Sequence, residues 1–340
     1  DFLKVTLKKG IRRLAEIRSF GFKNDGLKPS TSVRLYKMFI RPILEFGAQF
    51  LEFSDAQIEK LEVFQCNSLR TLLGLSGTTR QALIRVLCGI EPIKSRFENL
   101  KMQYYLRIRN MDKNRLLYRV VMHNLKILVQ TNPYDISLKI AKNSFAQCIK
   151  NSLIKIGKPQ YFTSYELPKN MIFVPGAIRR LHFYNDLASL VNSNSCKIIN
   201  AYFKNLDQQF GTFSKSYSGV PIGNIDLCGV NRDIRTTYLR CLTGKHFCSE
   251  NLSLKFRRSK LKCCPYCKNP SRNLSHYILD CPDFASIRNI IIEKIRNVKS
   301  DVSYNLENED SVIQLFCSNN PTILKEFAMY LHEIKTEFTK

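Results

Sequence analysis

The chain has 340 residues and a formal net charge of +25, with 44% hydrophobic and 24% charged side chains. This composition predicts a folded protein of two or three domains and excludes an intrinsically disordered chain. No apolar run approaches the roughly 18 residues that a membrane-spanning helix needs. The twelve cysteines are scattered and do not form the framework of a small secreted protein. We therefore expect an intracellular protein, nuclear or cytoplasmic, that makes no contact with a membrane.

The positive charge favours a polyanionic partner, RNA or DNA, because each neutralised phosphate releases condensed counterions. The whole excess lies in residues 1–260, since residues 261–340 carry equal numbers of cationic and acidic side chains. A solvated basic surface, a ribosomal role or attachment to a membrane surface would also account for such a charge.

Hydrophobic residues recur at helical spacing along most of the chain, which predicts a mainly α protein. The first predicted helix covers residues 2–19. A second begins at Ser30 or Thr31 and is kinked or split at Pro42, which lacks an N–H and crowds the preceding turn. A third begins at Ser54 or Asp55. The other predicted helices cover 78–89, the long segment after Pro92, 136–156, 177–191, 196–210, 233–242, 276–295 and 321–338.

Four potential metal ligands follow one another in the spacing C-x2-C-x8-H-x4-C. They are Cys264, Cys267, His276 and Cys281. Two cysteines two residues apart can bind one ion through a tight turn, and the later His and Cys complete the tetrahedron that Zn²⁺ accepts in closed structural sites. Cys263 competes with Cys264, and His246 or Cys248 could replace a ligand if the site differs. We expect structural zinc.

Many cations lie on predicted helix faces or around this cluster, where few acids neutralise them. A solvated face is the usual interpretation, but their number favours contact with phosphates. The candidate nucleic-acid-binding residues are Arg41, Arg96, Lys101, Arg107, Arg109, Arg257, Arg258, Lys260, Lys262, Lys268 and Arg272. Five aromatic residues among cations could stack on bases, although aromatic residues at helical spacing are more often core. They are Tyr104, Tyr105, Tyr118, Phe183 and Tyr184.

Three stretches resemble non-LTR (LINE-type, jockey-like) retrotransposon reverse transcriptases. Residues 35–48 (LYKMFIRPILEFGA) are similar to the segment that follows the polymerase palm in those proteins. Parts of 61–75 are similar to the next helix. Residues 239–245 and the four candidate ligands, followed by Pro282 and Arg288, resemble the carboxy-terminal zinc knuckle of the family.

The resemblance implies the carboxy-terminal part of such a protein, with a helical thumb and connector that grips a primer–template duplex. The implied architecture continues with a helical linker that carries the small CCHC zinc knuckle. The domains that we predict are a thumb-like helical domain (1–125), a helical linker region of unknown role (126–232), the zinc-knuckle module (233–300) and a C-terminal helix (301–340).

The catalytic groups of such an enzyme are missing from this sequence. Nucleotidyl transfer needs paired carboxylates for two metal ions, and the chain has no Asp-Asp pair. No RNase H pattern is present in 126–232, and Pro282-Asp283 resembles an endonuclease motif only loosely. We expect no enzymatic activity from this chain alone. The polymerase palm would lie upstream in the same parent polypeptide, as the start at Asp1 rather than Met also suggests.

The leading hypothesis is therefore a nucleic-acid-binding fragment of a retrotransposon reverse transcriptase. Its basic helices and structural zinc knuckle would grip template RNA or target DNA. The alternative is a host-encoded helical interaction protein with a purely structural zinc site.

Overall fold

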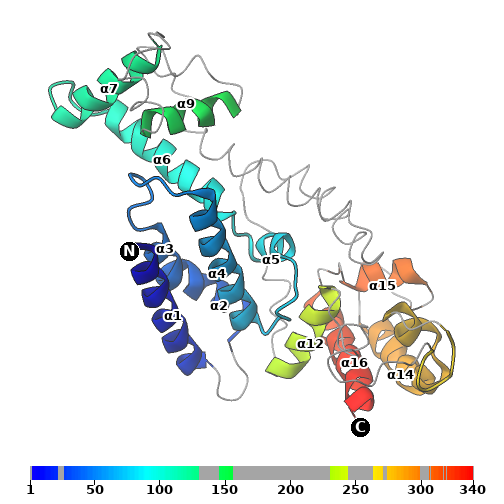
Figure 1. The fold of residues 1–340 in the computed structure, drawn as a ribbon. Helices are drawn as coiled ribbons and strands as arrows, with labels where there is room; N and C mark the ends of the chain where they lie inside the picture. The colour runs from blue at the N-terminus through cyan, green and yellow to red at the C-terminus, as the bar shows by residue number, and fades with distance from the viewer. Residues whose placement is uncertain are drawn as a thin grey trace. The chain divides into compact units, whose positions relative to one another are not determined.

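Every regular element that the structure describes is a helix, as the sequence predicts (Figure 1). The computed structural model describes residues 2–21, 27–129, 145–155, 230–243, 263–270, 274–298, 306, 308–316, 318 and 320–339. Within these ranges, no helix is both long enough and apolar enough to cross a bilayer. The predicted helices at 177–191 and 196–210, and most of the first half of 136–156, lie outside the described residues.

The residues divide into two compact units that interleave along the chain. Unit 1 comprises Asp1–Ile11, Met38–Gln65 and Glu91–Asn185, and unit 2 comprises Arg12–Lys37, Cys66–Ile90 and Asp186–Lys340. The domain boundaries predicted after residues 125, 232 and 300 stay predictions.

The α-helices are α1 (Phe2–Gly21), α2 (Pro29–Leu35), α3 (Arg41–Glu45), α4 (Asp55–Leu73), α5 (Gln81–Cys88), α6 (Ile93–Arg109), α7 (Leu116–Val129), α9 (Phe145–Lys155), α12 (Arg232–Leu242), α14 (Ala285–Arg296), α15 (Glu309–Phe316) and α16 (Pro321–Thr339).

Pro42 divides the second predicted helix, as expected. A π-helical turn, η1 (Tyr36–Ile40), separates α2 from α3, and Pro42 lies in the first turn of α3, where its missing N–H leaves no bond unmade. The predicted caps Ser30 and Thr31 are wrong, because α2 begins at Pro29 after an extended Lys28 that makes no side-chain cap. Proline is itself a good first helical residue, so the helix needs no hydroxyl cap there.

The start of α4 is capped as the sequence predicts. The Ser54 hydroxyl accepts a hydrogen bond from the N–H of Gln57 at 3.3 Å, and the Gln57 side chain accepts one from the N–H of Ser54 at 2.9 Å. This reciprocal arrangement is a capping box, which satisfies two backbone donors that the first helical turn leaves free.

The end of α4 depends on Gly74, whose φ of +69° lies in the left-handed region. We expect Gly74→Ala to lower the free energy of unfolding by about 1–2 kcal/mol, because a Cβ is disfavoured at this φ. The added atom would also lie only 3.0 Å from Oγ1 of Thr236. Urea-induced unfolding followed by circular dichroism measures the change.

Gly77→Ala is the matched control, since no atom lies within 4 Å of the added Cβ and the glycine has no positive φ. It is expected to be neutral or to stabilise by about 0.5 kcal/mol through the unfolded chain. Equal stability of the two variants would contradict the role of Gly74.

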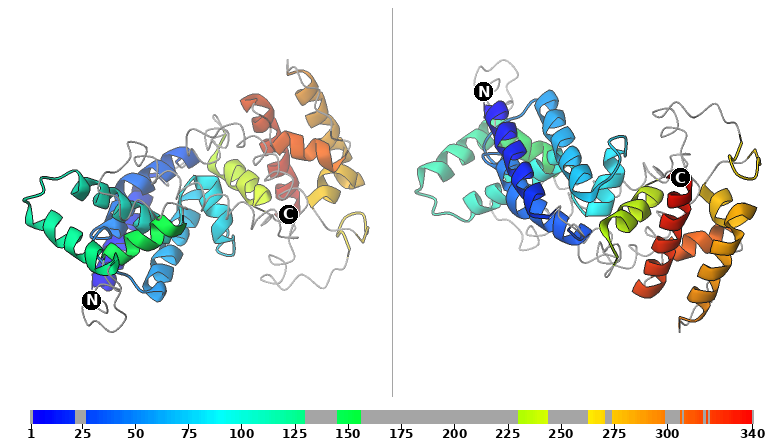
Figure 2. Two further views of the ribbon diagram at one scale, coloured as in Figure 1. Left: turned by 90° about the horizontal axis from the view of Figure 1, so that it is seen from above. Right: turned by 90° about the horizontal axis from the view of Figure 1, so that it is seen from below.

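Helices α6, α7 and α9 form a hydrophobic cluster within unit 1, and α7 and α9 lie against α6 in all views (Figures 1 and 2). The long predicted helix after Pro92 is interrupted between α6 and α7. There the Asp112 side chain accepts a hydrogen bond from the N–H of Asn114 at 2.9 Å, and its carbonyl accepts one from the N–H of Arg115 at 3.1 Å. The buried members of the cluster are Met102, Tyr105, Ile108, Val121, Leu125, Ala146, Ile149 and Leu153.

Helix α16 is the centre of the described C-terminal part of unit 2 and packs against α12, α14 and α15. Its residues Phe327 and Tyr330 are buried, and the ring of Phe327 meets that of Phe316 from α15 edge-on at 4.9 Å. Helix α15 precedes the helix predicted at 321–338 and was not expected. It is short, but Asn308 and Ser311 cap it reciprocally.

Candidate metal centre

The four predicted ligands lie together, as the sequence spacing predicts. Their ligand atoms, Sγ of Cys264, Cys267 and Cys281 and a ring nitrogen of His276, all lie within 4.8 Å of one another. Sγ of Cys264 and Sγ of Cys281 are 3.9 Å apart, and Sγ of Cys267 is 3.3 Å from Nε2 of His276. In a tetrahedral site with Zn–S bonds of about 2.3 Å, two sulfurs are separated by roughly 3.8 Å. The cluster therefore fits a metal ion such as zinc.

A tight backbone turn brings the first two cysteines together. The carbonyl of Cys264 accepts a hydrogen bond from the N–H of Lys268 at 3.1 Å, and the N–H of Cys264 donates to the carbonyl of Asn269 at 2.7 Å. Lys268 has a φ of +62°, the only positive φ among the described non-glycine residues. This left-handed residue reverses the chain directly after Cys267, which allows both thiols to face one point.

The other two ligands lie at the ends of a π-helical turn, η5 (His276–Asp280). The N–H of Cys281 donates to the carbonyl of His276 at 2.8 Å, five residues back. Pro282 then begins a short 3₁₀ turn, η6 (Pro282–Phe284), so the predicted continuous helix 276–295 is interrupted at Cys281. A π-turn spaces its ends by five residues, which is why H-x4-C can present both side chains to one ion.

Burial and local hydrogen bonds shift the pKa values of Cys264, Cys281 and His276. Burial raises the pKa of Cys264, but hydrogen bonds from the backbone of Cys267 and Tyr266 more than offset this, so its pKa is lowered. Burial raises the pKa of the Cys281 thiol to about 12, and the neighbouring Cys264 adds to the shift. Burial also lowers the pKa of His276, which keeps its ring neutral, the form that binds metals.

Residues outside the cluster hold the backbone between the last two ligands in place. The guanidinium of Arg288 on α14 donates hydrogen bonds to the carbonyls of Leu279 and Cys281. The hydroxyl of Tyr330 on α16 donates to the carbonyl of Ile278 at 2.8 Å. Such outer contacts orient metal ligands and fix their positions before the ion arrives. Sequence spacing did not reveal the role of Tyr330, which lies far along the chain.

The choice of Cys264 over Cys263 agrees with the structure, since Cys264 belongs to the four-residue group and Cys263 does not. The possible substitutes His246 and Cys248 lie outside the described residues. With four protein ligands the site has no open position for a catalytic water, which is the pattern of structural zinc sites.

The candidate nucleic-acid contacts near this cluster are mostly outside the part of the chain that the structure describes. These are Arg257, Arg258, Lys260, Lys262 and Arg272. Lys268 is described and exposed, and its amino group donates to the carbonyl of Pro265 at 3.1 Å.

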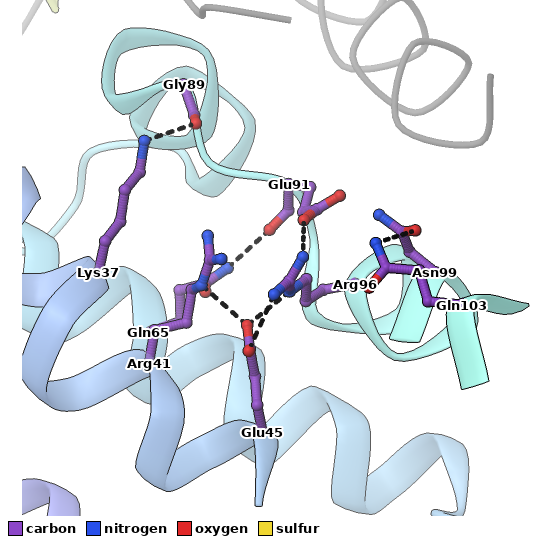
Figure 3. A network of polar contacts seen from close by, with 9 residues as sticks. All are labelled: Lys37, Arg41, Glu45, Gln65, Gly89, Glu91, Arg96, Asn99 and Gln103. Carbon is purple, nitrogen blue, oxygen red and sulfur yellow. Dashed lines mark hydrogen bonds and ion pairs between the residues drawn. The ribbon is translucent and has the colours of Figure 1, made fainter. Parts of the chain in front are cut away.

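Two of the predicted contacts in unit 1 are used in an internal ion-pair network (Figure 3). The Arg96 guanidinium donates to both carboxylate oxygens of Glu45, at 2.6 and 3.0 Å, and lies 3.4 Å from a carboxylate oxygen of Glu91. Arg41 pairs with the same Glu45 at 2.8 Å. Arg96 and Glu45 are only 14% and 13% exposed. This network joins α3 to α6 and occupies both guanidinium groups.

Lys101 is also directed into the protein. Its side chain is 8% exposed, and its amino group lies 2.7 Å from a carboxylate oxygen of Glu52. The thiol of Cys148 on α9 lies 3.0 Å from the same oxygen, and burial followed by this hydrogen bond raises the pKa of Cys148 to about 11. The three side chains line a cavity of about 330 Å³ within unit 1.

The remaining candidates lie at the end of α6. Arg107 is exposed, whereas Arg109 is half-buried and lies 5.9 Å from the ring centroid of Tyr105. Three further cations, Lys113, Arg115 and Arg119, are exposed in the turn that follows and at the start of α7. They lie on the same predicted basic segment, but sequence alone could not separate them from the cations that form internal pairs.

Comparison with protein-family models, curated proteins and solved structures finds no match to this chain. What the residues themselves establish is a helical protein with a Cys₃His cluster suited to a metal ion. The resemblance to retrotransposon reverse transcriptases stays a hypothesis.

Proposed function

We propose that this chain binds RNA or DNA as the carboxy-terminal part of a non-LTR retrotransposon reverse transcriptase. Its basic helical surface would grip the phosphate backbone, and its Cys₃His module would hold structural zinc. The polymerase centre would belong to the parent polypeptide, so the chain alone binds and does not polymerise.

The observation that carries the proposal is the group of cations where α6 meets α7, which we call the α6–α7 basic corner. Arg107, Lys113, Arg115 and Arg119 are all exposed, and none has an ion-pair partner in the described part of the chain. Because the chain has a net charge of +25, it has too few acids to neutralise every cation. These four groups can therefore contact phosphates. Arg41, Arg96 and Lys101 are less available, because carboxylates already hold them.

The metal module supports the same function in a different way. An ion held by four protein ligands contributes folding free energy to a short segment that could not otherwise bury a core. The module would then present the cations around it, including exposed Lys268, in a fixed arrangement. Its role in the proposal is to organise a contact surface, not to perform chemistry.

Replacing all four residues of the α6–α7 basic corner by Gln is expected to weaken binding to a DNA duplex and to flatten its salt dependence. Each phosphate contact contributes about 0.9 to the slope of log K against log salt, so the slope should fall by about 3.6 if all four make contact. Fluorescence anisotropy at several salt concentrations measures this slope.

A control variant with Lys94→Gln and Arg12→Gln removes cations that already pair with acids, Asp55 and Glu16 respectively. Its slope should change little. Equal slopes for the corner variant and the wild type would contradict the assignment of this surface. Negligible binding of the wild type to any nucleic acid near 100 mM salt would instead favour a helical interaction protein with a structural zinc site.

A further inference from the structure

Several phenylalanine side chains of unit 1 are exposed, although aromatic residues usually belong to a core. Phe46 is 73% exposed and Phe50 is 54% exposed, and Phe2 is 41% exposed. The tyrosines that the sequence suggested for base stacking are less available, since Tyr105 is fully buried and Tyr104 and Tyr118 are half-buried.

These exposed side chains belong to the segment that follows α3 and to the start of α1, and we call Phe2, Val5, Phe46, Phe50 and Leu51 the aromatic face. A Cβ built on Gly47, the residue after Phe46, would lie 3.1 Å from Leu51 and 3.9 Å from the ring of Phe2. Val5 follows Phe2 by three residues on α1 and is 53% exposed. Figure 1 shows α1 lying beside α3, at whose end Phe46 is found.

The same segment is apolar on its opposite side. Ile40, Leu44 and Ala48 recur every four residues and are fully buried. Met38, Pro42 and Phe46 also recur every four residues, each two positions earlier, and are exposed. A helical segment with apolar side chains on two faces is expected to bury both, so the second face needs a binding partner. The core of unit 1 covers only one of them.

Exposed cations are found on α1 and α6, the two helices whose side chains contact the segment of the aromatic face. Lys8 and Lys9 of α1 are exposed and have no ion-pair partner in the residues that the structure describes. On α6, the ring of Tyr104 meets that of Phe50 edge-on at 4.7 Å, and exposed Arg107 follows Tyr104 by three residues. Exposed aromatic rings with exposed cations on neighbouring helices are complementary to a strand with flat bases and a phosphate backbone.

We propose that the aromatic face binds single-stranded RNA or DNA, with bases stacked on Phe46 and Phe50 and phosphates held by Lys8 and Lys9. Stacking requires the open face of an unpaired base, so a duplex cannot use these rings in the same way. The proposal rests on the proposed nucleic-acid-binding function and adds which form of nucleic acid the thumb-like region contacts.

The test compares binding of the zinc-loaded full chain to a single-stranded oligothymidylate and to a mixed-sequence DNA duplex of the same length. The double variant Phe46→Leu and Phe50→Leu keeps apolar side chains but loses both rings. Its affinity for the single strand is expected to fall about 30-fold, taking the lower end of the range for base–aromatic stacking at each ring. Its affinity for the duplex should stay unchanged.

Two further variants separate stacking from charge. Phe46→Tyr with Phe50→Tyr keeps the rings and should restore single-strand binding. Lys8→Gln with Lys9→Gln should lower the single-strand salt slope by about 1.4, whereas the leucine variant keeps the wild-type slope. Leu116→Ala, at a side chain 76% exposed on α7, is the control for loss of exposed apolar surface and should have no effect.

The outcomes distinguish this proposal from the function on which it rests. If the wild type binds nucleic acid and the leucine variant binds the single strand equally well, the aromatic face is not a base-stacking surface. If the leucine and tyrosine variants both abolish concentration-dependent self-association of the chain, the face is a protein interface and the proposal is overturned. If the wild type binds no nucleic acid, the proposed function itself fails.

Discussion

Replacing Cys267 or Cys281 by Ser is expected to abolish stoichiometric zinc binding and to unfold the segment around residues 263–298. Both thiols belong to the four-ligand group. Structural zinc contributes about 10–16 kcal/mol of apparent binding free energy, which is folding free energy where the site does not exist in the unfolded chain. Elemental analysis of the purified protein gives the zinc content.

Hydrogen exchange shows where the structure is lost. Amides of the turn after Cys264 and of η5 should lose protection in the serine variants and after treatment of the wild type with a chelator. The cluster formed by α6, α7 and α9 has its own hydrophobic core and should keep its protection.

Cys263→Ser is the matched control, because this thiol neighbours Cys264 in sequence but lies outside the ligand group. It should retain one zinc ion per chain. Unchanged zinc content on losing Cys267 or Cys281 would show that the site is wrong.

The second large effect is expected from Glu45→Gln, which should lower the free energy of unfolding by about 3 kcal/mol. Glu45 is the shared partner of Arg41 and Arg96, and all three side chains are less than a quarter exposed. Removing one charge from a buried pair leaves the other charge without compensation, which is why the cost exceeds that of an exposed pair. The lower end of the usual range applies because Arg96 keeps its contact with Glu91.

The direction of the Arg96 pKa agrees with this expectation. Burial lowers the pKa of Arg96, but the hydrogen bond and charge of Glu45, with those of Glu91, more than offset burial and raise it. Arg96 thus stays charged at every ordinary pH and needs the carboxylate. Urea-induced unfolding measures the loss of stability, and hydrogen exchange in α3 and α6 locates it.

Glu16→Gln provides the comparison, because Glu16 pairs with Arg12 and Arg13 on the exposed side of α1. An exposed pair contributes at most about 1 kcal/mol, and many contribute nothing measurable. If Glu45→Gln destabilised no more than Glu16→Gln, the network of Figure 3 would not be what joins α3 to α6.

Local patterns predicted most of the described helices. The capping box at Ser54 and the break at Pro42 involve neighbours three or four residues apart, so the sequence contains all the information they need. The metal ligands were predictable for the same reason, since a tight turn and a π-turn fix their spacing locally. Helix α15 was not predicted, although its start carries the local cap formed by Asn308 and Ser311.

Only the tertiary structure decided what the cations and aromatic rings do. The ion pair of Arg41 with Glu45 has the i,i+4 spacing of helix neighbours, so the sequence alone could suggest it. The pair of Arg96 with Glu45 joins residues 51 positions apart, which no local pattern indicates. Likewise, the sequence around Phe46 does not show which side of this segment the core covers, and the structure shows that Phe46 is exposed. Periodicity reports the direction of a side chain around its own helix, whereas exposure and ion pairing depend on which other helix lies opposite. The sequence therefore determined the helices and the ligand set, and the packing of α1, α3, α4 and α6 determined which basic and aromatic groups are left for a partner.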